Sequence, residues 1–355
     1  MATPKFLKGQ GNFHSEIKTR VNNYFTEVQK PQTGNTSLFL KGILFCILYL
    51  FLYIHLVFFT PVLWLAIPEC VLLGSVTAAI GFNVMHDGAH GSFSKYAWVN
   101  KIASYSLNFL GASALLWNMK HNILHHTYTN VDGVDDDIEV KPWLRLCESQ
   151  KRHRFHKFQH YYVWFLYTLL HVLWIWGTDL KKYFRGKIVD VPLRKWSVKE
   201  HISFWIAKLV YGFMMVALPI YILGFTTWLI GFAITAMVTG FTIGIVFQLA
   251  HTVEETQFPL PAEGSGKIES EWAIHQILTT ANFATNNKLI SWYVGGLNFQ
   301  VEHHLFPKIS HIHYPAISKI IKQTCAEYGI KYNEYKRMSQ AIVSHYFYMR
   351  KLGKA

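Results

Sequence analysis

The sequence predicts an all-α integral membrane protein with four transmembrane helices in two hairpins, additional interfacial helices, and a cytoplasmic helical cap that carries a metal site. Three observations lead to this fold class. Half of the 355 residues are hydrophobic and only 15% are charged. The apolar residues form long uncharged blocks that provide the roughly 20 residues a membrane-spanning helix needs. Histidines gather next to these blocks in three clusters, namely His86 and His90, then His121, His125 and His126, and finally His303 and His304.

The first 38 residues are polar and are predicted to form a cytoplasmic N-terminal tail. They contain basic residues but lack the short apolar core of a cleavable secretory signal. We therefore expect the first transmembrane helix to direct insertion. The remaining residues, 39–355, are predicted to form one domain.

Two uncharged blocks define the hairpins. Residues 42–85 contain a single charge, at Glu69, and predict spans at about 42–62 and 65–85. A second block covers the 45 residues from Leu209 to Val253, with a turn expected near Gly224. It predicts spans at about 207–224 and 228–250.

The distribution of basic residues predicts the orientation. No Lys or Arg occurs in residues 42–94 or 209–266, although the chain contains 34 of them. The positive-inside rule then places the basic segments and both termini in the cytoplasm. Because each hairpin returns the chain to the same side, a cytoplasmic cap built from residues 86–206 and 251–355 would bring all three histidine clusters together.

Two further apolar stretches, residues 102–117 and 161–178, are predicted to be helices that lie in the membrane interface. If only one of them were a span, the even parity would be lost. If both were spans, the first two histidine clusters would be separated. The second stretch is rich in Tyr and Trp, whose rings settle at headgroup depth.

Charge and cysteine usage narrow the possible functions. A net charge of +13 favours contact with anionic headgroups and an acidic protein partner, and no nucleic-acid-binding motif is present. The four cysteines lie far apart without a C-x-x-C pair, which disfavours an iron–sulfur cluster or a zinc ribbon. We expect them to be reduced.

The first histidine cluster follows the second predicted span. His86 and His90 are four residues apart and share one helix face, so both can reach a common metal. Asp87 lies off that face. It is predicted to accept a ring N–H and fix a histidine tautomer, or alternatively to be a helix-end charge that faces water.

The second cluster can serve two neighbouring metals from one helix, because its histidines occupy positions i, i+4 and i+5. An acidic run follows it. These side chains are predicted to support metal-bound histidines through hydrogen bonds, with an exposed acidic loop as the alternative. The candidates for this supporting role are Asn130, Asp135 and Asp136.

The third cluster also favours two metals. Adjacent residues such as His303 and His304 project about 100° apart on a helix, so a single metal would bind both only with strain. Gln300, one turn earlier, offers an amide oxygen to a metal or a bound water, or is a core glutamine. His251 closes the fourth span and is an eighth candidate imidazole, with an interfacial anchor as its alternative role.

The number of histidines indicates the metal. Structural zinc takes four ligands and catalytic zinc three, whereas seven or eight imidazoles suit two iron ions. The Glu-x-x-His pairs of soluble di-iron proteins are absent. The other eleven histidines lack comparable spacing, and surface or packing roles suffice for them.

The segment Gly-Leu-Asn-Phe-Gln-Val-Glu-His-His at residues 296–304, the three-box arrangement and the hairpin–loop–hairpin order resemble the membrane fatty acid desaturases. This resemblance covers nearly all residues after 38. Gln300 stands where the third box of many members begins with histidine, which is similar to the front-end branch that includes linoleoyl-type delta-6 and delta-5 enzymes. Thr129-Asn130 and Asp135-Asp136-Asp137 are similar to that branch too.

The resemblance implies a centre of two Fe ions that uses O2 to convert adjacent methylenes of a lipid- or CoA-linked acyl chain into a cis double bond. The implied ligands are His86, His90, His121, His125, His126, His251, His303 and His304, with Gln300 as a further candidate. We expect an apolar tunnel for the acyl chain, with Trp117 and Trp292 as candidate lining residues.

Many front-end enzymes carry an N-terminal cytochrome b5 domain with a His-Pro-Gly-Gly motif. This sequence lacks the motif, and its polar tail is too short for such a domain. We therefore expect an external electron donor, either ferredoxin or cytochrome b5 with its reductase. The lack of this fusion and of a retrieval signal at residues 351–355 favours a bacterial inner membrane over the endoplasmic reticulum.

Two alternatives remain open at this point. An acyl or sphingolipid hydroxylase could use the same di-iron scaffold, because retention of a hydroxyl group depends on fine positioning. A metal transporter or a haem membrane protein is the more remote alternative. Transport sites usually lie near the bilayer midplane, whereas these clusters lie at the cytoplasmic ends of the spans.

Overall fold

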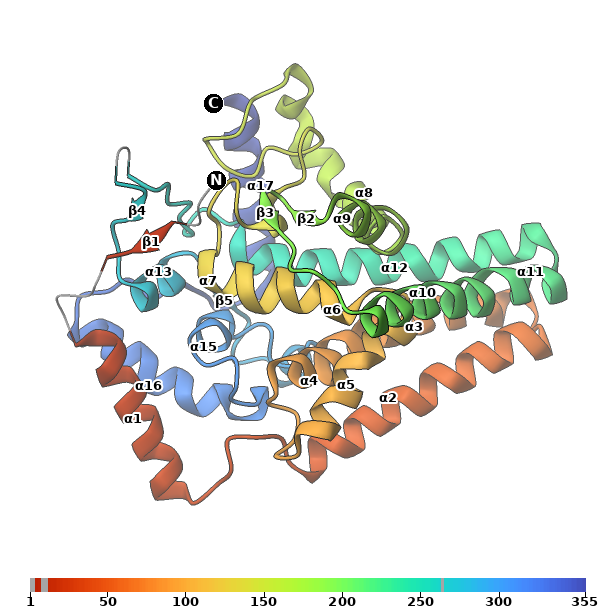
Figure 1. Ribbon diagram of the computed structural model, residues 1–355, viewed down its shortest axis with the longest axis horizontal. Helices are drawn as coiled ribbons and strands as arrows, with labels where there is room; N and C mark the ends of the chain where they lie inside the picture. Colours follow the sequence, from red (N-terminus) through yellow and green to blue (C-terminus); the bar gives the residue numbers. More distant parts are fainter. Residues whose placement is uncertain (1–3, 8–11, 263–264) are drawn as a thin grey trace.

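The computed structural model describes residues 4–7, 12–262 and 265–355. Long apolar helices form one half of the molecule, and shorter helices and loops form the other (Figure 1). In these described residues the strands form three two-residue pairings, which confirms the all-α prediction at this coarse level. They are β1 (Lys5–Phe6) with β4 (Lys267–Ile268), β2 (Lys187–Ile188) with β3 (Val191–Pro192), and β5 (Asn282–Phe283) with β6 (Glu334–Tyr335).

The first hairpin consists of α2 (Thr36–Ile54) and α3 (Leu63–Ile80). The side chain of Asn35 caps α2 by accepting a hydrogen bond from the Leu38 amide. A π-helical turn extends α2 to Phe59. A second π-helical turn, residues 81–85, continues α3 into α4 (His86–His90), so the helix delivers the first histidine cluster directly.

The second hairpin consists of α10 (Val198–Gly212), α11 (Leu218–Leu223) and α12 (Phe225–His251). A π-helical turn over residues 213–217 joins α10 to α11. The chain reverses at Gly224, where φ is +78°, a conformation that glycine adopts easily and that matches the predicted turn. Helix α12 ends at His251.

Five helical stretches of the described residues are long and apolar enough to cross a membrane, one more than predicted. The additional stretch, Arg154–Arg185, contains α8 (Gln159–Val172) and α9 (Asp179–Arg185). In Figure 1 the coil around α9 is viewed nearly end-on, whereas α12 runs across the page. This stretch therefore crosses the hairpins instead of running along them, an orientation that suits the interfacial position predicted for residues 161–178.

The first stretch predicted to be an interfacial helix, residues 102–117, is broken. It forms α5 (Ala97–Phe109) and α6 (Ala114–Trp117). Between them Gly111 adopts φ +94°, and a side chain there would meet the Tyr211 ring at 2.6 Å. Packing of the second hairpin against this loop thus interrupts the helix, which the apolar pattern alone does not reveal.

The cap contains the N-terminal segment as well as the predicted residues. Helix α1 (Phe13–Val28) buries Phe13, Ile17, Val21 and Phe25 in one hydrophobic cluster with parts of α13 and α16. The polar tail is therefore partly a packed element of the cap. The remaining helices of the cap are α7 (His126–Tyr128), α13 (Trp272–Leu278), α14 (Lys288–Tyr293), α15 (Gln300–Leu305), α16 (Tyr314–Glu327) and α17 (Met338–Lys354).

Candidate metal centre

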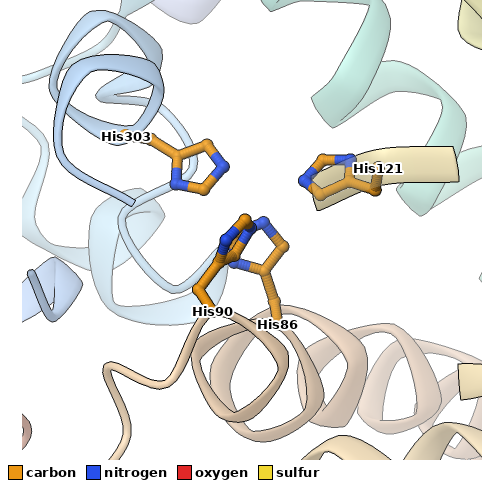
Figure 2. A group of neighbouring side chains, drawn as sticks. All are labelled: His86, His90, His121 and His303. Atoms are coloured by element: carbon orange, nitrogen blue, oxygen red, sulfur yellow. The ribbon is translucent and has the colours of Figure 1, made fainter. Parts of the chain in front are cut away.

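Eight buried histidines from four separate parts of the chain meet where the hairpins join the cap. They come from α4, from the π-helical segment 118–125 that leads into α7, from the end of α12, and from α15. Figure 2 shows four of them, with the rings of His121 and His303 directed from two sides toward those of His86 and His90. The sequence clusters therefore form one constellation.

The ring nitrogens form two groups with different members. One nitrogen from each of His86, His90, His121 and His303 lies within 4.8 Å of the others, and the same holds for His125, His251 and His304. His126 forms a further such group with His303 and His304 and so lies between the first two. The first two groups share no residue and lie side by side, with His303 in one and His304 in the other, whereas His126 and a fourth group of His121, His125 and Asp137 connect them.

Helix geometry explains why the second cluster divides in this way. Residues 118–125 form a π-helix, in which residues five apart lie one turn apart. The Nε2 atoms of His121 and His126 accordingly approach to 3.2 Å. An α-helix would have aligned positions four apart instead. Single-turn π-helices often occur at functional sites.

Six of these rings have a buried Nε2 atom without a hydrogen-bond partner among the described residues. They are His86, His90, His125, His251, His303 and His304. In the other two rings, His121 and His126, the Nε2 atoms lie against each other. A buried polar atom without a partner costs about 1–3 kcal/mol. These six atoms belong to rings whose nitrogens lie within 4.8 Å of one another in groups, so they are a donor set that fits metal ions which prefer imidazole, iron included.

The Nδ1 atoms of His125, His303 and His304 have hydrogen-bond partners. His125 Nδ1 lies 3.0 Å from Asp135, and the carboxylate of Asp137 is an ion-pair neighbour at 3.2 Å. His304 Nδ1 lies 2.8 Å from the amide oxygen of Gln276, and His303 Nδ1 lies 3.2 Å from the Tyr314 hydroxyl. These acceptors favour the tautomer with a proton on Nδ1, which leaves the Nε2 lone pair free for a metal.

The electrostatic environment keeps most of the cap imidazoles neutral. Burial, reinforced by repulsion from neighbouring imidazoles, lowers the pKa of four of them well below the ordinary histidine value. These are His121, His126, His303 and His304. Burial also disfavours a charge on His125, but the carboxylates of Asp135 and Asp137 outweigh it and raise its pKa.

The predicted supporting residues have different environments. Asp135 contacts His125, as expected for its role. Asp87 does accept a ring N–H, but from His311 at 2.9 Å, a histidine that sequence spacing had assigned to surface or packing. Asn130 donates its side-chain amide to the carbonyl oxygen of His251 at 2.9 Å. In the described structure Asp136 forms ion pairs with lysines and contacts no histidine.

Gln300 is buried and lies beside His251. Its amide nitrogen donates to the Leu297 carbonyl at 2.8 Å, which leaves the amide oxygen as the atom available to a metal or a water. Asp137 belongs to the acidic run whose carboxylates were predicted to support the histidines, and it lies 3.2 Å from His125. Sequence reasoning missed Gln276 and Tyr314 as partners of the clustered histidines, because both lie in segments without any spacing pattern.

A cavity of about 470 Å³ reaches the histidines. At one end the exposed Lys181, Arg185 and Asp190 form its mouth. Farther in, apolar side chains such as Leu107 and Phe247 line it beside His86 and His121. The walls are therefore suited to a long apolar molecule with a polar end.

The two tryptophans predicted to line an acyl tunnel lie in different places. Trp117 lines the cavity. Trp292 is not among the described lining residues and packs instead against Phe45, with Lys41 over its ring. Trp292 is 47% exposed.

Comparison with known proteins links this geometry to one family. A family model described as fatty acid desaturase matches residues 62–336. The sn-1 linoleoyl-lipid 6-desaturase of Synechocystis is 38% identical over 99% of this chain and 98% of its own length. The enzyme of the same name from Arthrospira platensis is 35% identical over 96% of this chain and 92% of its own. An acyl-lipid (8-3)-desaturase of Physcomitrium patens is 34% identical over 96% of this chain and 72% of its own length.

Proposed function

The chain belongs to the fatty acid desaturase family and is a fatty acyl desaturase, and we propose that it acts on a linoleoyl group of a membrane lipid. The new cis double bond would be introduced at carbon 6, between the carboxyl end and the existing double bonds. The names of the two cyanobacterial relatives support this substrate and position.

The cavity is the structural observation that supports this proposal best. It joins a charged mouth to an apolar interior and passes the histidine constellation on the way. A lipid-linked acyl chain changes in the same order from polar to apolar along its length, from the polar head through the carboxyl-side segment to the apolar tail. A front-end reaction needs the metal centre nearer to the head than to the tail, and the cavity continues inward beyond His86 and His121 to buried apolar residues.

We propose two iron ions at the two nitrogen groups. One would be held by His86, His90, His121 and His303, and the other by His125, His251 and His304, with His126 between them and Gln300 beside His251. The unpaired Nε2 atoms and the hydrogen-bonded Nδ1 atoms support this assignment. Asp135, Gln276 and Tyr314 would orient the ligands.

The reaction removes two hydrogens from adjacent methylenes and consumes one dioxygen, two protons and two electrons to form the double bond and two waters. Iron ions bound at the histidines would supply dioxygen activation and hydrogen removal. The protein would position the acyl chain and keep water out of the cavity. Trp117 and Phe247 line the cavity beside His121 and would exclude water there, and the apolar part of the lining would hold the acyl chain in one register.

We further propose that the centre faces the cytoplasm of a bacterial cell and receives electrons from ferredoxin, or from cytochrome b5 with its reductase. The basic segments that border the spans support this orientation. The cyanobacterial relatives support a bacterial membrane.

The test is expression in a host that contains linoleoyl lipids but no 6-desaturated lipids. Gas chromatography with mass spectrometry should reveal 18-carbon chains with a new double bond at carbon 6. His125→Ala and His303→Ala should abolish the product and lower bound iron, whereas His201→Ala, at an exposed position, should change neither. A hydroxylated product, a bond at another carbon, or full activity without iron would overturn the proposal.

A further inference from the structure

Two polar side chains, Thr77 and His171, interrupt the apolar lining at the buried end of the acyl cavity, beside Leu110. The same three residues also line a second cavity of about 10 Å³, which lies deeper among the hairpins. Tyr211 and Met215 are on the wall of that second cavity. The two spaces are thus neighbours separated by a thin partition.

His171 and Tyr211 form this partition. The His171 Nε2 atom lies 3.2 Å from the Tyr211 hydroxyl, and both side chains are buried. The surroundings are otherwise mostly apolar helices long enough to span a membrane, where buried polar groups are costly and usually functional. An apolar pair would fill the same space without that cost, so packing alone does not account for these two residues.

A rigid junction holds the partition in place. The Tyr211 ring lies against Gly111, where an added Cβ would be 2.6 Å from the ring. One turn before Tyr211, the Lys208 ammonium donates to the carbonyl oxygens of Gly111 and Ile175 at 2.8 Å and to Asp179 at 2.9 Å. Ile175 and Asp179 follow His171 on the crossing stretch. Lys208 therefore ties together the two segments that carry the pair.

Helix geometry also marks these positions. A π-helical turn follows each residue of the pair, at residues 173–178 after His171 and 213–217 after Tyr211. The π-helical segments 81–85 and 118–125 precede or carry histidines of the metal centre. Since π-helical turns frequently occur at functional sites, this shared feature adds support to the geometry of the partition.

We propose that the His171–Tyr211 pair is the end wall of the acyl cavity and sets how many carbons the enzyme accepts beyond the reacting methylenes. This inference rests on the proposed function, because it requires an acyl chain in the cavity. The methyl end of a chain of the accepted length stops at the pair. A longer chain must displace a hydrogen-bonded ring that Gly111 and Lys208 hold in place, and each additional methylene in a closed pocket changes selectivity roughly 10- to 200-fold.

The test compares acyl substrates of 16, 18 and 20 carbons that share the double bonds at carbons 9 and 12 and differ only at the methyl end. The measured quantity is the conversion of the 20-carbon chain divided by that of the 18-carbon chain. Tyr211→Ala joins the two cavities and should raise this ratio at least tenfold. Tyr211→Phe keeps the ring but loses the hydrogen bond to His171, and it should raise the ratio by less than Tyr211→Ala does.

Tyr221→Ala is the matched control, since Tyr221 is exposed on the neighbouring helix α11 and should leave the ratio unchanged. Tyr211→Leu, which is shorter than tyrosine but keeps apolar bulk, serves if the alanine variant fails to fold, and it should also raise the ratio. An unchanged ratio in a folded, iron-containing Tyr211→Ala or Tyr211→Leu protein overturns the inference. Loss of all desaturation by the wild-type enzyme would instead contradict the proposed function.

Discussion

The side chain of Gln276 illustrates how a single residue prepares the metal centre. Its amide oxygen lies 2.8 Å from His304 Nδ1 and 2.9 Å from the Thr129 hydroxyl. The acceptor favours the His304 tautomer whose Nε2 faces the other imidazoles. Partners of this kind matter because an imidazole free to rotate or to shift its proton binds a metal less tightly.

Replacement of Gln276 by leucine should therefore weaken metal binding. We expect roughly 10- to 100-fold lower affinity for iron in Gln276→Leu, because His304 loses its acceptor. Gln276→Glu retains an acceptor oxygen and should recover most of the affinity. The measurement is iron per chain after dialysis against a graded chelator. Gln323→Leu, at an exposed position on α16, is the control, and equal iron retention by Gln276→Leu would contradict the assigned role.

His311 shows the same principle across a longer distance. Its Nδ1 binds Asp87 at 2.9 Å, and its Nε2 lies 3.2 Å from the Lys41 ammonium. These two contacts connect the first histidine cluster to α2 and to the segment after α15. Asp87 thus contributes to the centre by fixing the position of α4 rather than by contacting His86 or His90.

At the scale of elements, the close crossing of α8 and α12 determines where the cavity wall lies. Gly240 permits this crossing, because an added Cβ would be 2.7 Å from the Thr168 carbonyl oxygen and 2.8 Å from that of Tyr167. The approach brings His171 on α8 next to the spans. A larger residue at position 240 would push the two helices apart.

Gly240→Ala should consequently destabilise the protein. Overpacking against backbone atoms costs about 1–3 kcal/mol, so we expect the thermal unfolding temperature in detergent to fall by several degrees. Gly231→Ala on the same helix is the matched control, because its Cβ would meet only the Cys70 sulfur at 3.5 Å. Equal unfolding temperatures for the two variants would show that the crossing tolerates separation.

For the whole molecule, the main question is how the crossing stretch Arg154–Arg185 sits relative to the bilayer. Its length and composition permit a span, whereas its orientation across the hairpins suits the interface. Both of its ends contact the cap side of the molecule. His156 lies against α17 near Gly353, and Lys182 pairs with Asp136 in the loop after the second histidine cluster.

Cysteine labelling can decide between the two arrangements. We expect Lys157→Cys and Lys181→Cys to react with a membrane-impermeant maleimide from the same side of the membrane, because the stretch returns to the interface at both ends. Trp64→Cys, between the first two spans, should react from the opposite side. The background variant replaces Cys46, the exposed native cysteine. Labelling of positions 157 and 181 from opposite sides would establish a fifth span.

Hydropathy and residue spacing are local properties of the chain, so the apolar helices, the turn at Gly224 and the histidines that come together could be predicted from the residues alone. Which imidazoles share a group could be seen only in the folded protein, since π-helical turns change the alignment within the second cluster. The tertiary structure also decided the partners Gln276, Tyr314 and His311 and the His171–Tyr211 wall. These contacts join segments far apart in the chain, and no local pattern encodes which distant side chain will be packed opposite.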